Sequence, residues 1–446
     1  MSGRRFPSPR LRLALALYRA LWWIGLPLVL LYLRKRGRAD PDYARHLAER
    51  FGRHTPLRGG RPIWIHAVSL GEMRSAAPLV RAFLDRGETI ILSHFTPAGR
   101  REAHKAFAAE MADGRVRSVW VPFELGFAWR RFLRALRPRC GLVMEIEIWP
   151  VMILECRKAG VPLFMCNAQY PSKSFARDTT RTGLRADLMR GFAGAFVKSD
   201  LQRDRFASVG VGPIAVTGET RFDQPIPPAL LAAAPPARAA LAGTRPVVTL
   251  ASAVEGEDAL YLDAIERALA AHEAAGRPRP FFVYVPRAPE RFDTVADLIA
   301  ARGLCALRRS AALGQDLTVT AATTGADILL GDSLGEMYFY LAMADRVIVG
   351  GGFTPQGAHN IIEPLAVRKP VIVGPEIWTI EYPALEAIAA GVCLHLQTQA
   401  DLDAALAPDA AFVPSEDRIA AFVTAHSGAT ARTLAALAAL LPATRR

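Results

Sequence analysis

Two series of short apolar runs, each alternating with amphipathic helical segments, limit what this chain can fold into. The first series has six runs, at 62–68, 88–93, 116–122, 141–145, 161–166 and 195–198. The second series also has six, at 246–251, 281–285, 328–330, 346–349, 370–373 and 392–394. Short apolar runs separated by helices predict parallel strands whose sheet is covered by helices on both faces. We therefore expect an α/β protein with two open parallel sheets.

A segment rich in proline and alanine, residues 223–245, separates the two series and predicts a linker with a short helix. We expect a basic hydrophobic segment at 1–50, one Rossmann-like domain at 51–222 and a second at 246–446. The chain has 446 residues, enough for two domains of ordinary size. The alanine-rich stretch 417–441 has helical spacing, and we expect it to close the second domain.

The net charge limits the possible partners, and the spacing of the cysteines limits the possible compartment and metal sites. A net charge of +13 is compatible with nucleic acid, an anionic membrane surface or a phosphorylated substrate. Beyond the N-terminus the basic residues are scattered among acids, and no nucleic-acid-binding motif is present, so we expect no nucleic-acid partner. The five cysteines show neither paired nor CxxC spacing, which indicates a reducing compartment and argues against a zinc site.

The N-terminal segment has the composition of a membrane anchor. Nine arginines and lysines precede the first acidic residue, Asp40, and flank a stretch at 13–33 that is apolar except for Arg19. Its uninterrupted part, 20–33, is shorter than the roughly 20 residues that span a bilayer. Basic flanks suit anionic headgroups, and tryptophans suit the interface. We expect an anchor that spans or lies in the membrane; the alternative is a buried core helix.

The stretch 349–375 carries the densest set of ligand-binding signals. Three glycines, 350–352, follow a predicted strand and allow the backbone to turn sharply and approach a ligand. We expect a helix from about Ala358, whose free amide groups would face the glycine loop and favour an anionic group. His359, Asn360 and Glu363 would lie on its first turns. Together these features indicate a sugar-nucleotide site, although a tight turn alone would explain the glycines.

In the first half, acidic and basic residues follow the predicted strands. Glu72 would lie in the first helical turn after the first strand, where it is either a general base or a helix-capping acid. Glu145 and Glu147 follow a buried run, where burial is costly unless they are paired or functional. Arg221 near the end of this half is suited to a phosphate, or to a surface ion pair.

In the second half, three more loops follow predicted strands and would lie at the same sheet edge as the glycine loop. They contain Glu255 and Glu257, then Pro286 and Arg287, then 334–336. Arg287 suits a phosphate, Glu363 a ribose diol and the backbone of 334–336 a base edge. Two DxD sequences at 40–42 and 401–403 lie away from these loops, so we predict no metal. No GxGxxG follows the first strand and no P-loop is present, which disfavours dinucleotide redox chemistry and nucleotide hydrolysis.

Six segments together resemble the bacterial 3-deoxy-D-manno-octulosonic acid (Kdo) transferases: WIHAVSLGE, MEIEIWP, TGETRFD, PRAPERF, GDSLGEM and GGGFTPQGAHNIIEP. The resemblance runs from the N-terminus to about residue 430. It implies a GT-B fold, two Rossmann-like domains facing across a cleft with an N-terminal anchor helix. It also implies an inverting transfer of Kdo from CMP-Kdo to the lipid A precursor, lipid IVA, at the cytoplasmic face of the inner membrane, without a cofactor or a metal.

The resemblance also assigns roles to residues of this chain. Glu72 matches the family's proton acceptor, and Glu145 matches a residue that stabilises the transition state. Arg221 occupies a second such position, where lysine is usual. The stretches that hold CMP correspond to Pro286 and Arg287, to Leu334, Gly335 and Glu336, and to Asn360, Ile361, Ile362 and Glu363.

Three positions depart from the family pattern. Gln169 stands where arginine is usual, and Val254 and Ala288 replace histidines. The changes leave the expected base in place but alter polar groups around it. They keep two other interpretations open: a divergent GT-B transferase that uses another sugar nucleotide or acceptor, and a membrane-bound scaffold without turnover.

Overall fold

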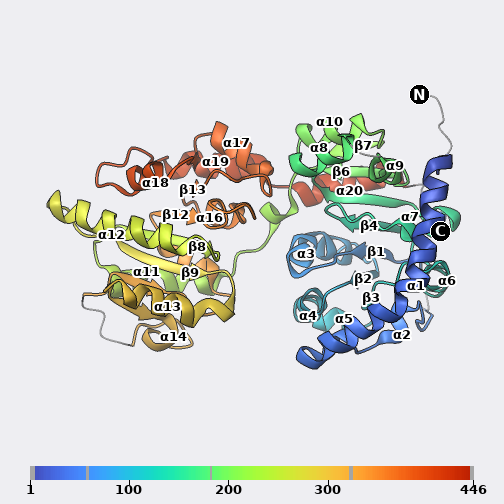
Figure 1. Cartoon of the computed structure of the whole chain (residues 1–446), viewed down its shortest axis with the longest axis horizontal. Helices are drawn as coiled ribbons and strands as arrows, with labels where there is room; N and C mark the ends of the chain where they lie inside the picture. The colour runs from blue at the N-terminus through green and yellow to red at the C-terminus, as the bar shows by residue number, and fades with distance from the viewer. Residues whose placement is uncertain (1–5, 57–59, 181–182, 321–324, 442–446) are drawn as a thin grey trace. The chain divides into compact units, whose positions relative to one another are not determined.

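The computed structural model describes residues 6–56, 60–180, 183–320 and 325–441. Contacts divide the chain into two compact units, Met1–Gln224 with Ser427–Arg446, and Pro225–His426. Each unit contains one seven-stranded parallel sheet with helices on both faces (Figure 1). The predicted α/β class with two parallel sheets is therefore confirmed.

The first sheet has the strand order β3-β2-β1-β4-β5-β6-β7. Its strands are β1 (Ile63–His66), β2 (Ile90–His94), β3 (Val116–Trp120), β4 (Cys140–Met144), β5 (Leu163–Ala168), β6 (Gly194–Val197) and β7 (Ile214–Val216). The helices of this unit are α1 (Pro9–Ala39), α2 (Leu47–Arg50), α3 (Leu70–Leu84), α4 (Pro97–Ala106), α5 (Ala108–Ala112), α6 (Gly126–Leu136), α7 (Pro150–Lys158), α8 (Ser172–Thr180), α9 (Leu184–Met189), α10 (Asp200–Ser208) and α20 (Ala429–Leu440), with short 3-10 turns η1 (Pro41–Tyr43) and η2 (Thr220–Asp223).

The second sheet has the order β10-β11-β9-β8-β12-β13-β14. Its strands are β8 (Val247–Ala253), β9 (Phe281–Pro286), β10 (Ala306–Arg308), β11 (Ile328–Leu330), β12 (Arg346–Val349), β13 (Val371–Val373) and β14 (Cys393–His395). The helices are α11 (Pro228–Ala242), α12 (Asp258–Ala274), α13 (Phe292–Ala301), α14 (Arg309–Ala312), α15 (Met337–Met343), α16 (Ile362–Ala366), α17 (Glu381–Ala389), α18 (Gln399–Leu406) and α19 (Glu416–His426), with the 3-10 turn η3 (Pro289–Arg291).

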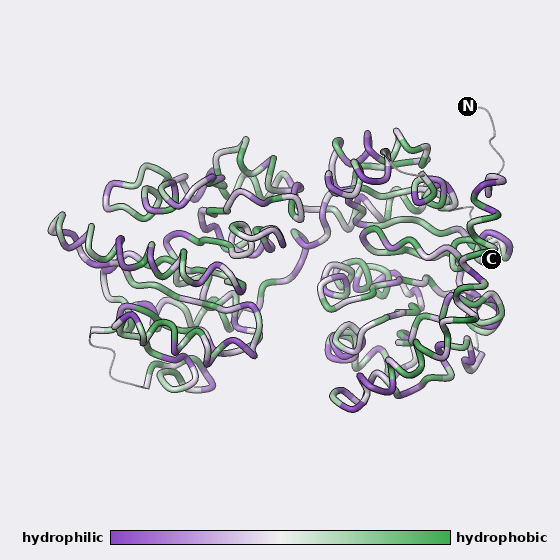
Figure 2. Tube along the Cα trace, in the orientation of Figure 1, coloured by the Kyte–Doolittle hydropathy of each residue, from purple (hydrophilic) through white to green (hydrophobic). Residues whose placement is uncertain are grey.

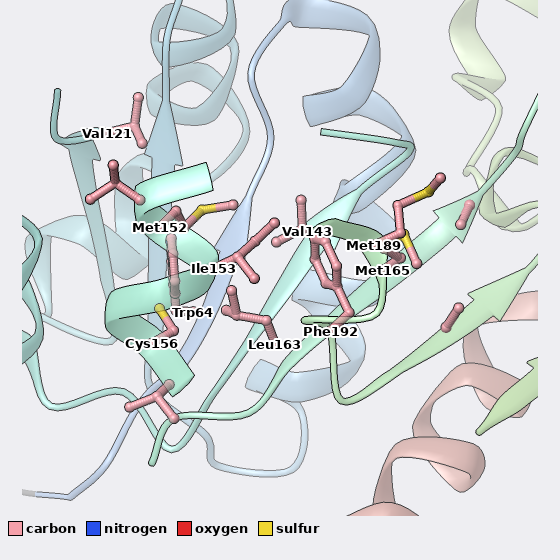
Figure 3. Packing of buried hydrophobic residues seen from close by; sticks show 14 of the residues in the cluster. Trp64, Val121, Val143, Met152, Ile153, Cys156, Leu163, Met165, Met189 and Phe192 are labelled. Carbon is pink, nitrogen blue, oxygen red and sulfur yellow. The ribbon is translucent and has the colours of Figure 1, made fainter. Parts of the chain in front are cut away.

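Burial on both sheet faces explains why the central strands read as continuous apolar runs. Every residue of β1, β2, β4, β5 and β6 is buried, and the strands form the apolar centre of each unit (Figure 2). On one face of the first sheet, Met152 and Ile153 of α7 pack with Val143 and Met165 of the strands (Figure 3). This packing holds the loops at the strand ends in fixed positions.

All twelve predicted strands are present, and the sequence missed two, β7 and β10. Both are edge strands of three residues with one paired neighbour. Their side chains are partly exposed. An edge strand buries less apolar surface than a central one, so its sequence lacks the apolar run by which the other strands are recognised.

The units differ from the predicted domain boundaries at two places. The predicted linker 223–245 is mostly the fifteen-residue helix α11, whose Ala234, Ala237 and Leu241 pack into the core of the second unit. The predicted closing helix is two helices, α19 and α20, separated at Gly428, which has φ 84°. Only α19 belongs to the second unit, because Leu434 and Leu437 of α20 pack into the core of the first.

Helix α1 has 31 residues and is the one helix in the described part of the chain that is long and apolar enough to cross a membrane. One of its faces packs against the first unit over nearly its whole length. Leu11 and Leu15 contact Leu154 and Leu188, and Leu33 contacts Phe123. The opposite face exposes the apolar side chains Leu13, Leu17, Leu21, Trp23, Ile24, Leu28 and Leu31.

Candidate active site

In each sheet, the strand order reverses direction at one point, and ligand sites of open α/β sheets usually lie at the carboxyl ends of the strands there. The reversal lies between β1 and β4 in the first sheet and between β8 and β12 in the second. Glu72 follows β1 and Glu145 follows β4; the glycine loop follows β12. The predicted site residues therefore collect at the expected edge of each sheet.

Glu72 lies in the first turn of α3, and its carboxylate folds back over the start of the helix. It accepts hydrogen bonds from the Val68 backbone N–H at 2.6 Å and from Ser69 Oγ at 3.2 Å. Ser69 is the N-cap and accepts from the Glu72 N–H at 3.4 Å. This reciprocal arrangement resembles a capping box, so the structural role that the sequence left open is present.

The Glu72 carboxyl is a weaker acid than an ordinary glutamic acid. The pKa of Glu72 is raised to about 8, mainly by burial; the Val68 hydrogen bond opposes this increase, and the negative charges of Glu147 and Glu145 contribute to it. A helix-capping acid that only stabilises a helix would favour its charged form. A carboxyl with a pKa near neutrality is suited to accept a proton from a substrate hydroxyl, so the geometry also fits a general base.

Glu145 is partly buried and joins a cluster of buried polar side chains at the ends of β4, β5 and β6. Its carboxylate accepts hydrogen bonds from Asn167 Nδ2 at 3.0 Å and from Lys198 Nζ at 3.0 Å. Lys198 also pairs with Glu219 at 2.7 Å, and Asn167 Nδ2 donates to Glu219 at 2.7 Å. Glu145 and Asn167 have left-handed backbones, with φ 56° and 54°. Left-handed backbones at non-glycine residues are costly and cluster at functional sites.

The charges of this cluster stabilise one another. Burial alone would lower the pKa of Lys198, but Glu145 and Glu219 raise it above the usual value. Burial alone would raise the pKa of Glu219, but Lys198 and Arg221 hold it below the usual value. The lysine is thus a fixed positive charge at the sheet edge.

Sequence reasoning missed Lys198 and Asn167. The signal was present for Lys198, because it follows the buried run GAFV and a charge in such a place is costly unless it is paired. The same reasoning had selected Glu145. Nothing in the local sequence marked Asn167, whose role depends on the loop after β7, 52 residues further along the chain.

Arg221 connects this cluster with the helix that carries Glu72. Its Nε donates to Ser75 Oγ at 2.6 Å, and its backbone N–H donates to Glu219 at 3.3 Å. A Cβ placed on Gly71 would lie 3.9 Å from Nη2 of Arg221. The structure therefore brings Glu72, Glu145 and Arg221, all predicted from sequence, to one edge of the first unit.

In the second unit the glycine loop 350–352 encloses a buried carboxylate. Glu257, which is fully buried, accepts hydrogen bonds from the N–H groups of Gly351 at 2.8 Å and Phe353 at 3.1 Å. It also accepts from the Val254 N–H and from Tyr261 Oη. The amides of Gly351 and Phe353 are therefore paired with an acid of the protein itself.

The glycines are required by contact between backbones. A Cβ on Gly350 would lie 2.4 Å from the Ser252 carbonyl oxygen, and one on Gly351 would lie 2.4 Å from that of Gly357. Gly351 also has φ 91°. Only glycine allows such close approach with this backbone geometry.

The predicted helix from Ala358 begins four residues later, as α16 at Ile362, and has five residues. The intervening backbone bonds to other loops, since the Ala358 N–H donates to the Glu376 carbonyl and the His359 N–H to that of Gly350. Asn360 Oδ1 accepts from the Ile362 N–H at 3.0 Å. Pairing of these amides outside the helix prevents it from starting earlier.

The predicted CMP-binding residues lie at one edge of the second sheet, in different environments. Pro286 ends β9 and is buried, whereas Arg287 is exposed. Leu334 is 72% exposed and Gly335 has φ 86°, so their backbone is open to a ligand. Ile361 and Ile362 have buried side chains, and Glu363 lies in the first turn of α16.

The carboxylate of Glu336 is hydrogen-bonded by other side chains of the protein. It accepts from Arg309 Nε at 2.6 Å and Nη2 at 2.7 Å, and from Ser333 Oγ. Burial alone would raise its pKa, but Arg309 and Ser333 hold it below the usual value. Glu336 therefore shapes the 333–336 loop.

His359 was named in the sequence but given no role. Its Nε2 is buried and has no hydrogen-bond partner among the described residues. Burial, followed by the nearby positive charge of Arg287, lowers the pKa of His359 to about 4, so the imidazole is neutral at pH 7. The ring lies against the glycine loop, because a Cβ on Gly351 would be 3.3 Å from His359 Cδ2.

The first unit has cavities at both edges of its sheet. A cavity of about 910 Å³ opens at the amino ends of the strands, between Arg61, Arg139 and Leu441. It lies at the opposite edge from Glu72. A smaller cavity of about 410 Å³ lies at the carboxyl edge, between α1 and Trp149.

A family model and two curated relatives with sequence similarity to this chain all carry the same description. A family model described as 3-deoxy-D-manno-octulosonic-acid transferase (kdotransferase) matches residues 45–224. The 3-deoxy-D-manno-octulosonic acid transferase of Bordetella pertussis is 40% identical over 419 residues, which are 92% of this chain and 96% of that protein. That of Haemophilus influenzae is 29% identical over 393 residues, 87% and 88% of the two chains.

Two solved structures support the fold. A glycosyltransferase from Rickettsia africae has a TM-score of 0.56 at 12% identity, over 86% of this chain and 100% of that chain. The glycosyltransferase of kitacinnamycin has a TM-score of 0.50 at 16% identity, with the same coverage. Together with the two Rossmann-like sheets, these likenesses confirm the predicted GT-B fold.

Proposed function

The chain belongs to the 3-deoxy-D-manno-octulosonic acid (Kdo) transferase family and is a glycosyltransferase, and on that premise we propose that it transfers Kdo from CMP-Kdo to lipid IVA with inversion. Kdo transfer gives the protein a role in lipopolysaccharide biosynthesis. The observation that carries the catalytic assignment is Glu72, a carboxyl with a pKa near 8 at the strand edge where the sheet order reverses.

In the proposed reaction, Glu72 takes the proton of the acceptor hydroxyl as the oxygen bonds to the anomeric carbon of Kdo. The bond from that carbon to the phosphate of CMP breaks, and CMP leaves with the electron pair. Ionised Glu72 has to give up its hydrogen bonds to Val68 and Ser69, or share them, to reach the hydroxyl. The raised pKa supports this role because it makes the carboxylate a stronger base.

Fixed positive charges would stabilise the leaving group. We assign this role to Arg221, whose position the resemblance links to transition-state stabilisation, and to Arg287, whose position it links to CMP binding; Glu145 acts by holding Lys198. Lys198 itself supports the proposal, because Glu145 and Glu219 keep it charged and buried in place, and preorganised charge is effective in catalysis. The CMP moiety would contact the open backbone of Leu334 and Gly335, Arg287 and the segment from Asn360 to Glu363.

The three departures from the family pattern occupy defined places around these sites. Gln169 accepts a hydrogen bond from Lys198 at 3.4 Å, so it joins the Glu145 cluster without the charge of an arginine. Val254 is buried beside the Glu257 carboxylate. Ala288 follows Arg287 in the β9–η3 loop.

We further propose that the protein works at the cytoplasmic face of the inner membrane, with α1 lying along anionic lipid. The packed face of α1 extends from Leu11 to Leu33, about 33 Å of helix at 1.5 Å per residue. A helix that crossed the bilayer would draw its partner Glu155, a buried carboxylate paired with Arg19, into hydrocarbon. Packing along its length therefore favours an interfacial helix over a spanning one.

The test is transfer of labelled Kdo from CMP-Kdo to lipid IVA by the wild type beside Glu72→Gln. We expect turnover by the wild type and a loss of at least about 100-fold in Glu72→Gln, the size of a general-base contribution. Circular dichroism and a thermal melt verify that the variant is folded. Full activity in a folded Glu72→Gln variant would reject the base, and no turnover by the wild type would reject the substrates.

A further inference from the structure

The smaller cavity, at the carboxyl edge of the first sheet, is formed by two parts of the chain that are far apart in sequence. Tyr18, Trp22 and Val29 of α1 form one wall. Phe95, Phe123 and Trp149, which follow β2, β3 and β4, form the other. Its volume of about 410 Å³ is within the range of about 300–1,000 Å³ that is usual for small-molecule sites. Its walls are mostly aromatic and aliphatic, so they suit an apolar occupant.

One charged side chain interrupts this apolar lining. Arg50 lines the cavity and is 1% exposed, and two of its nitrogens, Nε and Nη1, have no hydrogen-bond partner among the described residues. The third, Nη2, donates to the Phe95 carbonyl at 3.1 Å, and the guanidinium lies 4.4 Å from the centre of the Trp120 ring. Buried donors are normally paired, so the two free nitrogens point to an acceptor supplied from outside the described chain.

The cavity adjoins the surroundings of the proposed base. The Phe95 N–H donates to the carbonyl of Val68, the residue whose N–H donates to Glu72. Trp149 packs on Phe95, with ring centres 5.5 Å apart. Its Nε1 donates to Glu147 at 2.7 Å, and the charge of Glu147 acts on Glu72. The end of the cavity formed by these residues is thus next to the reaction site.

The other end is formed by the helix that carries the exposed apolar stripe. Val29 faces the cavity, whereas the adjacent Leu28 is 69% exposed on the outer face of α1. The cavity therefore lies between a surface suited to lipid and a carboxyl suited to a sugar hydroxyl. An occupant that connects the two is amphiphilic, with a sugar at one end and a hydrocarbon chain at the other.

From these contacts we propose that the cavity binds one acyl chain of the lipid acceptor, with the carbonyl of the chain's linkage facing Arg50. The inference rests on the proposed acceptor. It adds a subsite that distinguishes an acylated acceptor from a deacylated one. The apolar walls bury the methylene groups, and the unpaired guanidinium nitrogens supply donors to the carbonyl of the chain's linkage.

Filling the cavity from α1 tests the proposal by kinetics. Val29→Trp places an indole in the cavity, and the matched control Leu28→Trp places the same side chain on the exposed face. We expect Val29→Trp to raise KM for lipid IVA about tenfold, with kcat and KM for CMP-Kdo within about twofold of wild type. With the fully deacylated disaccharide as acceptor, Val29→Trp, Leu28→Trp and wild type should have equal kcat/KM. Equal KM values for lipid IVA would overturn the subsite.

A binding experiment on the wild type removes any dependence on turnover or on the folding of variants. Lipid IVA with a photoactivatable diazirine in one acyl chain is irradiated with the full-length protein in detergent, and the crosslinked peptides are sequenced. We expect labels on α1 near Val29 and on the segments that contain Phe123 and Trp149. Excess unlabelled lipid IVA should remove them, and excess phosphatidylglycerol should not.

The outcomes separate this inference from the proposed function. Labels confined to the exposed face of α1, or spread evenly over the protein, would overturn the subsite even if Kdo is transferred. Labels in the cavity that phosphatidylglycerol removes equally well would overturn the acceptor as its occupant and identify a bulk-lipid site. Specific labels in the cavity of a protein that transfers no Kdo would support the subsite while rejecting the donor.

Discussion

At the scale of single residues, the proposed base shows how structural and chemical roles share one side chain. Glu72 stabilises the start of α3 through Val68 and Ser69, and the same burial that makes it a good cap raises its pKa to about 8. Because Glu147 and Glu145 act on it in the same direction, neighbouring carboxylates tune its acidity.

This predicts a pH dependence. A general base must be ionised, so a carboxyl with a raised pKa loses activity as the pH falls below that value. We expect kcat/KM for the wild type to rise with pH and to reach half its maximum near pH 8. Glu147→Gln removes a negative charge that favours the protonated form, so the half-maximum should move to lower pH.

The measurement is the pH profile of kcat/KM between pH 5 and 10, which spans about the range in which this carboxyl titrates. The control is Glu88→Gln, since Glu88 pairs with Arg139 at the amino ends of the strands and should leave the profile unchanged. A wild-type rate that does not vary between pH 6 and 9, or an unmoved limb in Glu147→Gln, would contradict the tuning.

At the scale of elements, the glycine loop is positioned from inside by Glu257. The carboxylate comes from the loop after β8 and pairs with amides of the loop after β12, so it fixes two of the loops that form the predicted nucleotide edge. A loop held in this way can present its outer backbone to a ligand without moving.

We predict that Glu257→Gln weakens CMP binding and lowers the stability of the second unit. A glutamine has one acceptor oxygen where the carboxylate has two, so at least one buried N–H is left unpaired, at a cost of about 1–3 kcal/mol. Calorimetric titration with CMP and a thermal melt measure the two effects. Glu255, two residues before Glu257, is exposed, and Glu255→Gln should leave both unchanged. Equal behaviour of the two variants would exclude the positioning role.

At the scale of the whole molecule, both ends of the chain add helices to the first unit. Helix α20 returns after the second unit is complete and buries Leu434 and Leu437 in the first core. Helix α1 covers the side of that unit and leaves its own outer face apolar. The first unit thus carries the helix that we propose to lie on a membrane.

An interfacial α1 makes a prediction about membrane binding. Ile24→Asp with Leu28→Asp, on the face that is 75% and 69% exposed at these residues, should shift the protein from sedimented anionic vesicles to the supernatant. The fold should survive, because neither residue is packed. Leu298→Asp, an exposed leucine of α13 in the second unit, is the control.

Thiol labelling decides between lying along and crossing the membrane. In a Cys305→Ser background, which removes the exposed native cysteine, Arg10→Cys and Arg38→Cys place one thiol at each end of α1. A membrane-impermeant reagent should label both from outside intact vesicles, after the four buried native cysteines have been shown not to react. Protection of one end until detergent is added would establish a spanning helix instead.

The sequence by itself determined the parts of this protein that local chemistry specifies. Buried runs predicted twelve of the fourteen strands, and Glu72 and Glu145 were singled out because they follow two of those strands, at whose carboxyl ends they lie. Parallel strands place their carboxyl ends together whatever the detailed packing, so this part follows from pattern alone.

Tertiary structure decided what depends on partners distant in sequence. The Gly351 amide donates to Glu257, 94 residues earlier in the chain. Asn167 and Lys198 acquire their roles only through Glu219, and α11 and α20 join cores that their own composition does not reveal. The amphipathic division of α1 likewise follows from the surface on which it packs. Hydrogen-bond partners and buried surface are properties of the folded neighbourhood, and a linear pattern carries no direct record of them.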